Sequence, residues 1–265
     1  MELNTNQCLF CGTPLTGKRS VEHVFPQWLQ EKYGLHKEGV LQTHFSEVGD
    51  VLSSRHHSLA KHVCGRICKA CNNGWMAQIE TKTKPLVCDL AEHRYSFSDL
   101  NSQQCLLLAL WACKTAYSLH AASNYRMIVP EIHLRLLANQ TTGLPEGVWV
   151  FGHQHNCSEP FAWWQSPSWH ITADEEILTE DFLDSVSSTA YKICFSIRDL
   201  ALIVAYNPFP NMRLVLWKYF HYPIWPDRGP VFWYERDNLP KDNTHSVCIA
   251  LMSTMGLQQI EGKIE

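Results

Sequence analysis

The stretch CKACNNGWMAQIE, residues 68–80, places a Cys-x-x-Cys pair directly before two asparagines and a tryptophan. A second pair, Cys8 and Cys11, lies near the N-terminus. Two pairs of this spacing predict a tetrahedral site in which Cys8, Cys11, Cys68 and Cys71 hold a structural zinc ion. A small unit with little core of its own gains folding energy from such a site. Two alternatives stay open: Cys64 is a rival ligand, and the pairs could be free thiols or a redox couple.

The composition is that of a globular protein. The chain has 265 residues, and 45% of them are hydrophobic, which is too many for a disordered chain. Its eleven cysteines are not spaced like the disulfide framework of a secreted protein. The N-terminus lacks the basic start and apolar run of a signal peptide, and the longest apolar run, residues 105–113, is shorter than the ~20 residues that span a bilayer. These features predict a cytoplasmic protein with no membrane segment.

Charge is unevenly divided along the chain. The formal net charge is −4, which argues weakly against a nucleic-acid binder. Residues 1–84 hold 10 Lys and Arg against 7 Asp and Glu, a net of +3, whereas residues 85–265 hold 12 against 19, a net of −7. The basic part also contains the cysteine pairs. This asymmetry fits a nucleic-acid-binding N-terminal unit, and it fits chance variation in surface charge equally well.

The first predicted domain is the zinc-stapled unit, residues 1–84. Residues 35–60 are polar without a clear period, which predicts a loosely structured loop. A helix is expected to start near Asn72. Pro85 then marks the predicted domain boundary.

The second predicted domain, residues 85–265, is expected to be a mainly antiparallel α+β domain. A helical pattern over residues 98–120 is followed by strand-like alternation, with a hairpin turn at Arg198 and Asp199. The sequence leaves the role of this domain open between substrate selection, regulation by a ligand, and assembly into a homo-oligomer.

The residues between and after the cysteine pairs carry a resemblance to a known family. EHVFP, residues 22–26, followed by CKACNN, residues 68–73, resembles the HNH endonucleases, or ββα-metal nucleases, and especially a bacterial variety with EHVFP and CNNGWM signatures. The resemblance covers residues 8–80. It implies a treble-clef-like HNH module, a metal-dependent endonuclease that cuts DNA, and a role in restriction or anti-phage defence.

The resemblance also implies individual roles. His23 would be the general base, and Glu22 and Asn72 would bind one catalytic divalent cation, with Asn73 as a second candidate for the asparagine ligand. Mg²⁺ and Mn²⁺ are the expected cations, and Ni²⁺ is a further candidate. These residue types suit the chemistry, because a neutral histidine can take a proton from water and a hard cation can neutralise charge on a phosphate.

Each of these residues has a simpler interpretation. His23 could be a core or loop histidine, and Glu22 could be a surface carboxylate. Asn72 and Asn73 could cap the helix, which asparagine does well. Glu80 is expected to be a solvated residue on the helix surface.

One departure from the family pattern concerns the middle asparagine, which usually lies between the histidine and the second cysteine pair. No asparagine occurs from Val24 to Ala70, and His57, His62 and Arg66 are the candidates to replace it. The departure favours a second interpretation, a zinc-stapled DNA-binding module without catalysis. A third is a protein–protein adaptor in which zinc is purely structural.

Overall fold

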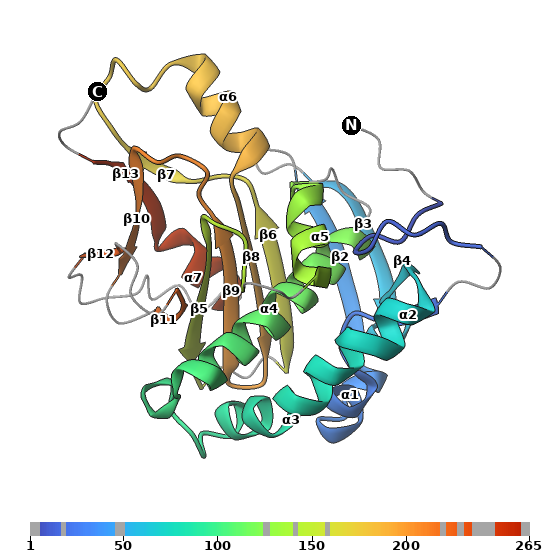
Figure 1. The fold of residues 1–265 in the computed structure, drawn as a ribbon. Coiled ribbons are helices and arrows are strands. Elements are labelled where there is room, and N and C mark those ends of the chain that lie inside the picture. The colour runs from blue at the N-terminus through green and yellow to red at the C-terminus, as the bar shows by residue number, and fades with distance from the viewer. Residues whose placement is uncertain are drawn as a thin grey trace.

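The protein has a mixed α+β fold, and the computed structural model describes residues 6–16, 20–45, 51–123, 128–139, 143–156, 160–217, 221–226, 231–234 and 247–260. The long helix α4 lies across a central sheet, and the N-terminal elements are grouped at one side (Figure 1). This arrangement agrees with the α+β class expected from the sequence.

The central sheet has five strands, each antiparallel to its neighbours. All seven residues of β8 are buried, because both faces of the sheet are covered. Ile193 and Phe195 belong to the core that includes α4, whereas Cys194 and Ile203 belong to a second core that includes α7. The strand order is β11 (Tyr222–Trp225), β5 (Val148–Gln154), β9 (Leu200–Tyr206), β8 (Tyr191–Ile197) and β6 (Phe161–Ser166).

A second, four-stranded sheet and helix α7 (Val247–Ser253) complete the core on the far face of the central sheet. Two of its strand pairs, β10 with β12 and β13 with β7, are parallel, and the pair β10 with β13 is antiparallel. The domain therefore contains both arrangements, with antiparallel pairs in the majority. The order is β12 (Val231–Tyr234), β10 (Met212–Trp217), β13 (Met255–Gln259) and β7 (His170–Thr172). Helix α6 (Glu180–Thr189) packs on this second core, whereas α5 (Glu131–Asn139) packs on the core that includes α4.

Helix α4 spans Ser102–Ala122 and starts later than the sequence pattern indicates. Its N-cap is Asn101, whose side chain accepts a hydrogen bond from the backbone N–H of Gln104, while the Gln104 side chain accepts from Asn101. By length and composition alone α4 could cross a membrane, but 72% of its apolar window is buried inside the protein, and core helices of soluble proteins pass the same test.

The expectation of a loose loop over residues 35–60 is wrong. The chain forms a two-stranded antiparallel hairpin of β2 (Gly39–Phe45) and β3 (Val51–Ser58), between two 3-10 turns at Leu35–Lys37 and Leu59–Lys61. The described side chains of the hairpin are exposed or half-buried. Alternation of apolar and polar residues reveals a strand only where one face is buried, so this hairpin left no period in the sequence.

The N-terminal unit is built on a short antiparallel pair, β1 (Ser20–His23) and β4 (Val63–Ile67). After β1 comes helix α1 (Gln27–Lys32), and after β4 comes α2 (Lys69–Cys71). A π-helical segment, Asn72–Met76, continues α2 into α3 (Ala77–Ala91). A helix therefore does begin beside Asn72, as the sequence predicts.

Pro85 does not end a helix, because it lies inside α3. Proline within a helix costs about 3 kcal/mol, and the burial of Leu86, Val87 and Leu90 in the core offsets that cost. The same hydrophobic core contains residues from both sides of position 85. The boundary between residues 84 and 85 is thus not a break in structure, and a division of roles between the two parts stays a prediction.

Lys192, on β8, gives the second core a measurable pH dependence. Its ammonium group is fully buried, donates to the carbonyl of Met252 at 3.0 Å and lies 4.6 Å from the ring centre of Trp169. Burial lowers the pKa of Lys192 to about 7 from the usual 10.5. Between these two values the unfolded chain holds a proton that the folded chain does not, so stability rises with pH by up to about 1.4 kcal/mol per pH unit.

We therefore expect urea unfolding of the wild type to show this rise between pH 7.5 and pH 9.5, and Lys192→Met to lack it. Subtracting the variant's pH profile removes the contributions of other groups. Identical slopes for both proteins would contradict the assignment.

Candidate functional site

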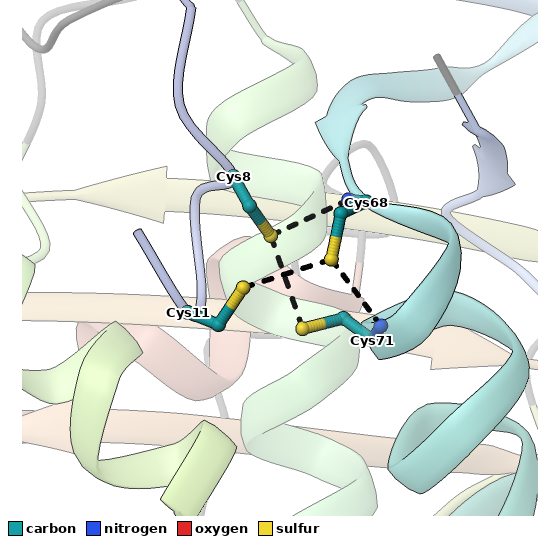
Figure 2. Close-up of side chains that lie close together, drawn as sticks. All are labelled: Cys8, Cys11, Cys68 and Cys71. Atoms are coloured by element: carbon teal, nitrogen blue, oxygen red, sulfur yellow. Dashed lines mark hydrogen bonds between the residues drawn. The ribbon is translucent and has the colours of Figure 1, made fainter. Parts of the chain in front are cut away.

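The four cysteines of the two Cys-x-x-Cys pairs meet in one cluster (Figure 2). Cys8 and Cys11 lie on a tight N-terminal turn, in which the N–H of Gly12 donates to the carbonyl of Cys8 and Gly12 has φ +74°. Cys68 is the N-cap residue of α2, and Cys71 ends that helix. The turn and the helix start thus present two thiols each.

The spacing of the sulfur atoms fits a single tetrahedral zinc ion. All four Sγ atoms lie within 4.8 Å of one another, with Cys8–Cys71 at 3.8 Å and Cys11–Cys68 at 3.6 Å. A Zn–S bond of about 2.3 Å places tetrahedral ligands about 3.8 Å apart. The prediction of a four-cysteine structural metal site is therefore supported, because these four residues could hold such an ion.

Backbone N–H groups orient two of the sulfurs. The N–H of Cys68 donates to Cys8 Sγ and the N–H of Cys71 donates to Cys68 Sγ, both at 3.4 Å. The hydrogen bond between the Cys8 and Cys71 side chains, with the sulfurs 3.8 Å apart, lowers the pKa of Cys8 to about 4 and raises the pKa of Cys71 well above its usual value. The two backbone N–H donors favour the thiolate form of the cysteines that accept from them, and the thiolate is the form that binds zinc.

Cys64, the rival ligand, lies outside the cluster. It is buried in β4 opposite Glu22, and burial raises its pKa to about 11. Such a thiol is inert and packs as a small apolar side chain.

Arg135 joins the cysteine turn to helix α5. Its guanidinium donates to the carbonyl of Cys8 at 2.9 Å and pairs with Glu131 four residues earlier. At Gly12 a Cβ would lie only 2.7 Å from Nη1 of Arg135. Glycine at this position therefore allows both the positive φ and the close approach of the guanidinium.

Glu22 and His23 are the last two residues of β1. Glu22 is buried, with 6% of its surface exposed, and His23 is half-buried. Successive side chains of a strand point to opposite faces, so a buried Glu22 directs His23 away from the core. The interpretation of Glu22 as a surface carboxylate is therefore wrong.

Asn72 lies next to β1, whereas Asn73 is exposed. The amide of Asn72 donates to Ser20 Oγ at 2.5 Å, which ties the helix start to the first residue of β1. Neither asparagine is the N-cap of α2, because Cys68 takes that place. The capping interpretation is not supported at that end of the helix.

An ion-pair triad that sequence analysis missed lies behind Glu22. Lys114, on α4, has a side chain with 0% exposure, and its Nζ lies 2.5 Å from Oε1 of Glu22 and 2.5 Å from Oε1 of Glu80. Glu80, on α3, is half-buried rather than solvated. A single lysine within the apolar run of α4 was the available signal, since lysine is almost never fully buried without a charged partner.

The triad perturbs the titration of its members. Burial acts to lower the pKa of Lys114, but the carboxylates of Glu80 and Glu22 outweigh it and raise that pKa above its usual value. Burial raises the pKa of Glu22, and the attraction of Lys114 offsets part of that rise. A buried carboxylate near an ammonium is thus held by charge pairing and not by water.

A second cation site of His, Cys, Asp or Glu ligands is not found in the described part of the chain, where the cysteine cluster is the one group of three or more such residues. Of the candidates to replace the middle asparagine, His62 is buried with its ring centre 5.8 Å from that of Trp163, and Arg66 is half-buried. The side chain of His57 lies outside the described residues.

Comparisons with protein-family models, with curated proteins and with solved structures gave no match to this chain. The class of protein therefore rests on the residues and geometry of the site itself.

We predict that Cys68→Ser abolishes the metal site. Purified wild type should contain about one zinc per chain, and the variant should lose most of it, because three thiolates and a hydroxyl make a weaker site. Elemental analysis measures the zinc content. Cys64→Ala is the matched control, a nearby buried thiol outside the cluster, and should keep its zinc. Unchanged zinc in Cys68→Ser would refute the four-cysteine site.

We predict that Lys114→Met destabilises the protein by about 3–5 kcal/mol, because it leaves the buried carboxylate of Glu22 and the half-buried one of Glu80 without a counter-charge. Urea unfolding measures the change. Lys82→Met, an exposed position on α3, should have little effect. Equal stabilities of the two variants would contradict the ion-pair triad.

Proposed function

We propose that the protein is a metal-dependent HNH endonuclease that hydrolyses phosphodiester bonds of DNA. The observation that carries this proposal is the order of elements around His23. Strand β1 ends at His23 and pairs with β4, and β4 leads into the cysteine cluster and the helix that bears Asn72. A strand pair followed by a helix, with a histidine at the end of the first strand, is the arrangement expected of a ββα-metal module.

His23 is the proposed general base. It is half-buried, so solvent and substrate can reach it, and the strand alternation directs it away from buried Glu22. A neutral imidazole takes a proton from the attacking water, and the water oxygen forms a bond to phosphorus while the bond from phosphorus to the leaving deoxyribose oxygen breaks. Solvent protonates the leaving oxygen, and the imidazolium returns its proton to solvent. The zinc ion would hold the strand pair and helix together without entering this step.

The resemblance implies that Asn72 and Glu22 hold a catalytic Mg²⁺ or Mn²⁺, which would neutralise charge on the phosphate. The hydrogen bond from Asn72 to Ser20 brings this asparagine beside the strand that carries Glu22. The fit is partial, because Oε1 of Glu22 already contacts the ammonium of Lys114. Residues 85–265 would select substrate, bind a regulator or mediate assembly. The proposed biological role is restriction or anti-phage defence in the cytoplasm.

We predict that purified protein nicks or linearises supercoiled plasmid with Mg²⁺, Mn²⁺ or Ni²⁺, and that His23→Ala lowers the rate by about 10²-fold or more. Gel electrophoresis of the plasmid over time measures the rate. His36→Ala, at an exposed position, is the matched control and should cleave like the wild type.

A DNA-binding module without catalysis is the second candidate, and the Lys114 partner of Glu22 is the observation that favours it. That candidate predicts salt-sensitive plasmid binding with no cleavage in any metal. If the protein neither binds nor cleaves plasmid, the protein–protein adaptor is the interpretation that is left.

A further inference from the structure

We propose that Lys114 is a positioning residue of the nuclease centre, which through Glu22 and Glu80 fixes the strand of His23 against the helix of Asn72. The inference rests on the proposed function and deepens it. Lys114 has no exposed side-chain surface, so it cannot touch a substrate and must act through its two partners.

The first ion pair of Lys114, with Glu22, connects α4 to β1. Oε1 of Glu22 contacts Lys114, and His23 is the next residue of the same strand. Because neighbouring side chains point to opposite faces, an anchored Glu22 also sets the direction of His23. Pairing with β4 holds the same two residues from the other side, with Glu22 opposite Cys64 and His23 opposite Val63.

The second ion pair of Lys114, with Glu80, connects α4 to α3. Glu80 lies in the first turn of α3, which continues the π-helical segment that starts at Asn72. Asn72 in turn donates to Ser20 on β1. The strand and the helix are thus joined at two points, one through the amide of Asn72 and one through the ammonium of Lys114, and both points lie beside the residues proposed to act on DNA.

This geometry gives Glu22 a different task from the cation-ligand role that the resemblance implies. A divalent cation on the same carboxylate would lie close to the ammonium of Lys114, and the two positive charges would repel each other in a buried site. Glu22 and Glu80 are instead equivalent in kind, since each gives one carboxylate oxygen to Lys114 at 2.5 Å. The two roles therefore differ in what they predict for Glu80.

The test compares Glu22→Gln with Glu80→Gln, two isosteric changes that each leave one carboxylate on Lys114. Lys192→Met is the control, a fully buried lysine in the other core. The amide of Val24, the residue after β1, donates to the carbonyl of His62 at 3.2 Å. Its hydrogen-exchange rate measures how stably the end of β1 is held, and the measurement does not require the protein to be active. Plasmid cleavage as a function of Mg²⁺ concentration gives kcat, KM and the half-saturating concentration of the cation.

If Lys114 positions the centre, both glutamine variants lower kcat by about tenfold, with KM for DNA and half-saturating Mg²⁺ within about twofold of the wild type. Both also speed exchange at Val24 by about tenfold, whereas Lys192→Met does neither. If only Glu22→Gln acts, and does so by raising half-saturating Mg²⁺, Glu22 is a cation ligand and the proposal is overturned.

Failure of the proposed function has a separate signature. If the wild type fails to cleave plasmid with any of the three cations, the proposed nuclease function is refuted. Hydrogen exchange at Val24 would still decide whether Lys114 holds β1 in place. Unchanged exchange in both glutamine variants would overturn the positioning role, whatever the cleavage result.

Discussion

The geometry of the N-terminal unit depends on four thiols that come from a tight turn and from a helix start, with 56 residues between Cys11 and Cys68. Closing so long a loop costs chain entropy, and the small strand pair of β1 and β4 offers little burial to offset it. A zinc ion held by the thiols would supply that free energy. The same closure brings Arg135 of α5 against the cysteine turn, so the metal site also joins the unit to the rest of the protein.

Two fully buried lysines show how the two cores differ. Lys114 lies between two carboxylates, which raise its pKa above the usual value, whereas Lys192 donates to backbone carbonyls, and burial lowers its pKa to about 7. Near neutral pH the first is a fixed positive charge, while the second can lose its proton and remain a hydrogen-bond donor. The charge-paired lysine lies on the side of the sheet that carries the cysteine cluster, and the other supports packing between the two sheets.

The sequence was sufficient for features that depend on local pattern or fixed spacing. The cysteine spacing correctly selected Cys68 and Cys71 over Cys64, and alternation around Arg198 located the hairpin of β8 and β9. Features that depend on distant partners were missed. The burial of Lys114 needs Glu22 and Glu80, which are far from it in the sequence, and Pro85 is accommodated in α3 because the helix packs into a core that no local rule reveals.

The ends of the β2–β3 hairpin meet at a narrow neck, where the N–H of Leu59 donates to the carbonyl of Glu38 at 3.2 Å. The chain therefore leaves the N-terminal unit and returns to it at nearly one point. A segment of this kind can change in length or be exchanged for another without moving the elements on either side, because the closing distance stays the same. In the laboratory, residues 39–58 are therefore the natural position to graft a foreign peptide while His23 and the cysteine cluster stay in place.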